Sequence, residues 1–96
     1  MESWLRDIEG ARSAAEVVRH ARDFCALLNP RDLEALPGET RELRIDSDAD
    51  IAPARERLAR GCAEARDGEA AKARDLLVLL TRAADRLEQL GSEARR

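Results

Sequence analysis

The chain of 96 residues is rich in alanine, leucine and arginine, and only 2% of it is aromatic, so an all-β or parallel α/β fold is excluded. Its 17 basic and 20 acidic residues are mixed along the whole sequence and give a formal net charge of −3. Because no basic face or tail stands out, the charge pattern argues against a nucleic-acid partner.

Residues 2–28 carry apolar side chains at helical spacing, but the apolar face rotates by roughly a third of a turn near Gly10. Ser13 and Glu16 have the spacing of a capping box. In that motif the serine oxygen accepts a hydrogen bond from the N–H of Glu16, and the glutamate carboxylate accepts one from the N–H of Ser13. The pattern predicts either two helices, over 2–10 and 14–28, or one helix bent between them.

A further helix start is predicted at residues 29–32, where Asn29 is a suitable N-cap and Pro30 a suitable first helical residue. This short helix is expected to run over 30–36 and to end before Pro37-Gly38. Residues 39–46 alternate only weakly between polar and apolar side chains. We therefore expect an extended connection across the bundle, because a lone strand without a partner is unstable.

Two longer helices are predicted in the second half of the chain. With Asp50 as N-cap, Pro53 falls in the first turn of a helix over 51–66. Asp67-Gly68 then marks a turn, and the last helix is predicted over 69–90, with Gly91 as its C-terminal stop. Apolar residues of this last helix follow the spacing of a coiled-coil seam, at Ala73, Leu76, Leu80, Ala83, Leu87 and Leu90.

These elements predict an all-α fold with a single domain over 1–96. It is a small bundle of three to four helices, in which the last two form an antiparallel hairpin. The core of one chain is thin, because 18 of its apolar residues are alanine. Extra burial in an oligomer would offset the entropy of ordering the chain, so we expect a homodimer.

The run Leu76–Leu80 covers the whole circumference of its helix, so its five apolar residues cannot all face one core. With Leu76 and Leu80 at the core, Val78 points away from it. A surface for self-association or for another protein is therefore predicted. The alternative is one tolerated exposed valine, with Leu77 and Leu79 covered by other helices. The predicted interface residues are Leu76, Leu77, Val78, Leu79, Ala84 and Trp4.

Residue types that build catalytic and metal sites are scarce. His20 is the only histidine, while Cys25 and Cys62 are far apart and neither has a paired base. The segment 46–50 has the acidic spacing that opens a calcium loop, but the glycine and glutamate that complete such a loop are missing. We therefore predict no catalytic residue, no cofactor and no metal site.

No run of 18 apolar residues exists, and the first residues lack the pattern of a signal peptide, so we expect no membrane association and a cytoplasmic location. The preference for arginine over lysine, together with abundant alanine, fits a GC-rich bacterial genome. The predicted function is a small non-enzymatic interaction or assembly module that self-associates through the 69–90 helix. The alternative is a small helical enzyme or ligand-binding protein. It requires guanidinium groups that converge on a pocket for an anionic small molecule.

Overall fold

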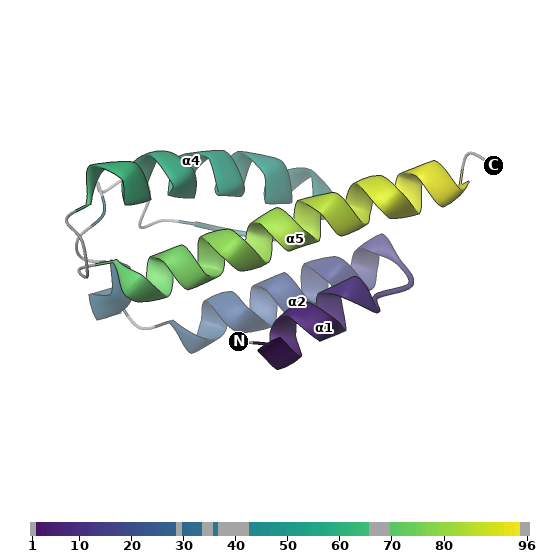
Figure 1. Ribbon diagram of the computed structural model, residues 1–96, viewed down its shortest axis with the longest axis horizontal. Coiled ribbons are helices and arrows are strands. Elements are labelled where there is room, and N and C mark those ends of the chain that lie inside the picture. Colours follow the sequence, from purple (N-terminus) through teal and green to yellow (C-terminus); the bar gives the residue numbers. More distant parts are fainter. Residues whose placement is uncertain (1, 29, 34–35, 37–42, 66–69, 95–96) are drawn as a thin grey trace.

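The computed structural model describes residues 2–28, 30–33, 36, 43–65 and 70–94, and within these ranges all regular structure is helical (Figure 1). The prediction of an all-α fold is confirmed. The elements, in chain order, are α1 (Glu2–Glu9), α2 (Ala14–Leu27), the 3-10 turns η1 (Pro30–Leu33) and η2 (Asp48–Asp50), α4 (Ile51–Glu64) and α5 (Ala71–Ala94).

The first 28 residues form two separate helices, which settles the choice between two helices and one bent helix. Ser13 is the N-cap of α2, and its hydroxyl oxygen accepts a hydrogen bond from the N–H of Glu16 at 3.3 Å, as predicted. The glutamate carboxylate, however, accepts from the N–H of Arg12 at 3.1 Å and not from that of Ser13. The predicted capping box is therefore only half formed, because the hydrogen bond to the glutamate comes from the residue before the N-cap.

Helix α4 begins at Ile51, as the position of Pro53 predicts. Asp50 is the N-cap residue of α4, as predicted, but its side chain makes no capping hydrogen bond to this helix. The Asp50 carboxylate instead accepts hydrogen bonds from the backbone N–H groups of Asp46 and Ser47, at 2.9 and 3.0 Å, which lie before it in the chain. These bonds hold the pKa of Asp50 below its ordinary value, because they favour the charged carboxylate.

Helix α5 continues to Ala94, so the predicted stop at Gly91 is wrong. Glycine ends a helix when it adopts the left-handed conformation, and Gly91 does not adopt it. In a right-handed helix, a glycine costs only about 1 kcal/mol relative to alanine. The three residues that follow, Ser92, Glu93 and Ala94, extend the helix despite this cost.

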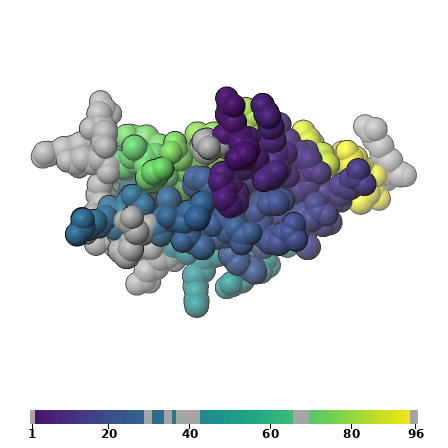
Figure 2. Space-filling view, turned by 90° about the horizontal axis from the view of Figure 1, so that it is seen from below, coloured from purple at the N-terminus to yellow at the C-terminus, as the bar shows by residue number. Residues whose placement is uncertain are grey.

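Helix α5 is the centre of the bundle, because it contacts α1, α2 and α4. Helix α4 lies along one side of α5, and α1 and α2 lie along the other (Figure 1). Seen from below, α1 and α2 form one face of the molecule, with α5 along one of its edges (Figure 2). The side chains buried between these helices form one cluster, whose largest fully buried members are Ile8, Val17, Leu36, Ile51, Leu58, Leu76, Leu79 and Leu80.

Of the short helix predicted over 30–36, the structure shows a 3-10 turn, η1, in which four residues are helical. Residues 43–45 have no regular structure, in keeping with the end of the predicted connection. Other predictions fall on residues outside the described ranges: the N-cap Asn29, the stop at Pro37-Gly38, residues 39–42 of the connection, the turn at Asp67-Gly68 and the start of the last helix at Glu69.

Candidate functional site

The apolar run Leu76–Leu80, in the first half of α5, points to all sides of the helix. Leu76 and Leu79 are 1% and 0% exposed, so the chain itself covers them in its core. Leu77 is half-buried and packs against that core. Val78 is 45% exposed, as the prediction that it points away from the core requires. Of the six predicted interface residues, Val78 alone is exposed to solvent in one chain.

Polar side chains lie on both sides of Val78. Toward α4, the Nε of Arg55 donates a hydrogen bond to the hydroxyl oxygen of Thr81 at 3.2 Å. Toward α1, Arg82 and Glu9 form an ion pair with an N–O distance of 3.1 Å. The outer face of α5 therefore presents one apolar side chain among polar ones.

The two remaining predicted interface residues are both half-buried within the chain. Trp4 of α1 packs edge to face on Phe24 of α2, with ring centroids 5.5 Å apart and an interplanar angle of 82°. Such T-shaped contacts are the preferred geometry of aromatic pairs, and this one holds α1 on α2. Ala84 packs against the core from α5.

The C-terminal end of α5 carries an apolar surface formed by seam residues outside the six predicted interface residues. At the start of the predicted seam, Ala73 and Leu76 are at most 1% exposed, whereas Leu87 and Leu90 at its end are half-buried. This change occurs because α5 extends beyond the first turn of α4 (Figure 1). The uncovered part of α5 lines an open groove of about 560 Å³.

We call this hollow the end groove. One of its walls is formed by Arg12, Ser13 and Ala14, at the turn from α1 into α2, and Asp48 of η2 also borders it. Its other wall belongs to α5 and consists of Leu87, Leu90, Gly91, Glu93 and Ala94. Because its apolar floor has charged residues at the rim, the groove resembles a small protein-interaction surface in composition.

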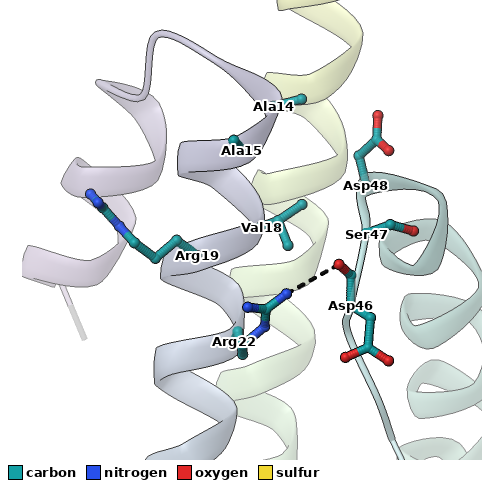
Figure 3. Close-up of a pocket in the computed structure, with 8 residues that line it drawn as sticks. All are labelled: Ala14, Ala15, Val18, Arg19, Arg22, Asp46, Ser47 and Asp48. Atoms are coloured by element: carbon teal, nitrogen blue, oxygen red, sulfur yellow. Dashed lines mark hydrogen bonds between the residues drawn. The ribbon is translucent and has the colours of Figure 1, made fainter.

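A second groove, of about 420 Å³, lies between α2 and the segment 46–48 (Figure 3). Ala14, Ala15 and Val18 of α2 line it, together with Arg19 and Arg22. Because two of its lining residues are arginines, it is a candidate for the predicted Arg-lined pocket.

The guanidinium groups do not converge on this second groove. Arg22 donates from Nε to the carbonyl oxygen of Ile45 at 3.0 Å and from Nη2 to that of Asp46 at 3.1 Å. Figure 3 shows that the guanidinium of Arg19 points away from the segment 46–48. Arg22 therefore fastens the segment before η2 onto α2, which is a structural role.

The two cysteines are free thiols held in their neutral form by burial. Burial raises the pKa of the half-buried Cys25 thiol to about 11. The pKa of the buried Cys62 thiol is also raised by burial, although the nearby charge of Arg74 acts in the opposite direction. Since the thiolate is the nucleophile, neither cysteine is activated for catalysis. His20 is half-buried on α2.

Among the described residues, no group of three or more His, Cys, Asp or Glu side chains is placed to hold a metal ion. No helix in the described part of the chain is long and apolar enough to cross a lipid bilayer. Comparison with known proteins finds no match: no family model fits the sequence, and no curated protein or solved structure matches it significantly.

Proposed function

We propose that the protein is a small non-enzymatic interaction module that self-associates through α5. The observation that carries this proposal is the uneven cover of the α5 seam. The chain buries the seam completely as far as Ala83 and leaves Leu87 and Leu90 lining an open groove. Val78 adds an exposed apolar side chain on the outer face of the same helix.

The small size of the core supports the same proposal. Several fully buried positions are alanines, among them Ala21, Ala70, Ala73 and Ala83. Burial stabilises a fold by about 25 cal/mol per Å² of apolar surface, so an alanine contributes much less than a leucine. A second chain that covers α5 would add the burial that one chain lacks.

We also propose that α4 and α5 form an antiparallel hairpin within a single domain over 1–96. Arg55, early in α4, donates to Thr81, near the middle of α5. The backbone carbonyl oxygen of Cys62, late in α4, accepts a hydrogen bond from the Nη2 of Arg74, early in α5, at 3.3 Å. This inverse order of partners is what an antiparallel pair requires. The single cluster of buried side chains supports one domain.

The partner in this proposal is a second copy of the chain in the cytoplasm, and another protein with a complementary apolar helix is the alternative. A ligand-binding or enzymatic role in an Arg-lined pocket has less support. In the groove between α2 and the segment 46–48, Arg19 and Arg22 do not converge, and Arg22 already donates to two backbone carbonyl groups.

The test is the oligomeric state of the wild-type protein by sedimentation equilibrium, from low to high micromolar concentration. We expect association that weakens in Val78→Asp or in Leu90→Asp. Leu27→Asp is the matched control, because Leu27 is 65% exposed at the end of α2. A wild-type protein that stays monomeric at the highest concentration would overturn the proposal, as would association that only Leu27→Asp disrupts.

A further inference from the structure

We propose that the second copy docks at the end groove, in a two-fold arrangement in which the C-terminal ends of the two α5 helices run antiparallel. This inference rests on the proposed self-association and adds its site, its geometry and the residues that pair.

The sizes of the residues along the groove favour this geometry. Antiparallel helices related by a two-fold axis pair residues that lie at equal distances before and after the axis. An axis midway between Leu90 and Gly91 places Leu87 opposite the partner's Ala94 and Leu90 opposite the partner's Gly91. Each leucine then faces a small residue. The space beside Gly91 is open, because a Cβ placed there would meet no atom within 4 Å.

The charges at the rim of the groove favour the same occupant. Arg12 lies on the wall formed by the turn between α1 and α2, and Glu93 lies on the α5 wall, so the groove carries both signs. Both side chains are exposed. In the proposed arrangement, Arg12 of each chain lies opposite the partner's Glu93, and the two-fold axis makes this ion pair form twice.

The small extent of the groove predicts a weak, reversible dimer. Stable interfaces bury about 800 Å² per partner. The end groove involves two turns of one helix and the residues around a tight turn, which is less than such an interface needs. We therefore expect association in the micromolar range and above, with rapid exchange between chains.

A charge swap tests the pairing without disturbing the core, because both residues are exposed. Arg12→Glu alone and Glu93→Arg alone place like charges opposite each other, and each is expected to weaken self-association by about tenfold. In an equimolar mixture of the two variants, each mixed dimer again has an acidic side chain opposite a basic one at both contacts between positions 12 and 93. The mixture is therefore expected to associate about as strongly as the wild-type protein. Circular dichroism verifies that both variants keep their helical content.

The outcomes separate this inference from the proposal on which it rests. If the wild-type protein associates but the mixture of swapped variants does not recover, the end groove is not the site, while self-association stands. The same conclusion follows if Val78→Asp abolishes association and both charge variants associate like the wild type. If the wild-type protein is monomeric at high micromolar concentration, both proposals are wrong.

Discussion

The Nε of Arg86 on α5 donates a hydrogen bond to the carbonyl oxygen of Ala11 at 2.9 Å. Ala11 lies in the turn between α1 and α2 and is 1% exposed. The bond therefore joins the central helix to a buried corner of the chain, 75 residues earlier in the sequence.

Arg86→Ala is expected to lower the free energy of unfolding by about 1.5–3 kcal/mol, because it removes a charged donor from a part-buried carbonyl group. Arg82→Ala is the matched control on the same helix. Its ion pair with Glu9 is exposed, with side-chain exposures of 53% and 55%, and should contribute less than about 1 kcal/mol. Urea unfolding measures both. Equal losses in the two variants would contradict a specific role of the bond to Ala11.

Gly91→Ala is expected to stabilise the monomer by about 0.5–1 kcal/mol, because alanine has the higher helix propensity and its Cβ meets no other atom here. Gly10→Ala provides the contrast, since a Cβ at Gly10 would lie 3.3 Å from the carbonyl oxygen of Arg6. That contact is tight and involves backbone, so the gain should be smaller or absent. Thermal unfolding of dilute protein compares the two. A loss of stability in Gly91→Ala would mean that this glycine does not lie in a regular helix.

The lowered pKa of Asp50 predicts a dependence of stability on pH. The folded-state pKa lies below the ordinary value of 3.8, so the carboxylate stabilises the fold above that value and loses this contribution as the pH falls through the folded-state pKa. Asp50→Asn removes the charge and should therefore be less stable than the wild type at neutral pH. The difference between the two proteins should disappear in acid.

Urea unfolding at several pH values, from neutral to below 3.8, follows this difference. Asp48→Asn is the control, since Asp48 is an exposed residue of the same 3-10 turn. A difference between wild type and Asp50→Asn that stays constant down to the lowest pH would show that the carboxylate charge is not what stabilises this turn.

Helix starts could be predicted from the sequence better than helix ends. Proline restricts the positions where a helix can begin, and Pro53 led to the correct first residue, Ile51. Glycine does not restrict the end in the same way. It stops a helix only in a left-handed conformation, which the sequence does not specify, and α5 therefore continues through Gly91.

The surface of α5 could be predicted only in part. The angle between successive residues on a helix placed Val78 opposite the core, and its exposure agrees with that prediction. The burial of Leu79 depends on how many helices surround α5, which its own sequence does not state. The end groove depends on how far α5 extends beyond α4, which the sequence of α5 does not specify. The role of Arg22 depends on a bond to a backbone carbonyl group, and every residue has such a group, so the sequence does not indicate the partner.

Helix α5 contacts α1, α2 and α4, whereas α4 has no comparably extensive contact with α1 or α2. The ribosome makes α5 after all of them. A nascent chain that has reached the end of α4 therefore contains α1, α2 and α4 without the helix that joins α4 to the other two. We therefore expect α4 to pack stably against α1 and α2 only after α5 has been made, and the apolar faces that α5 covers are available to chaperones until then.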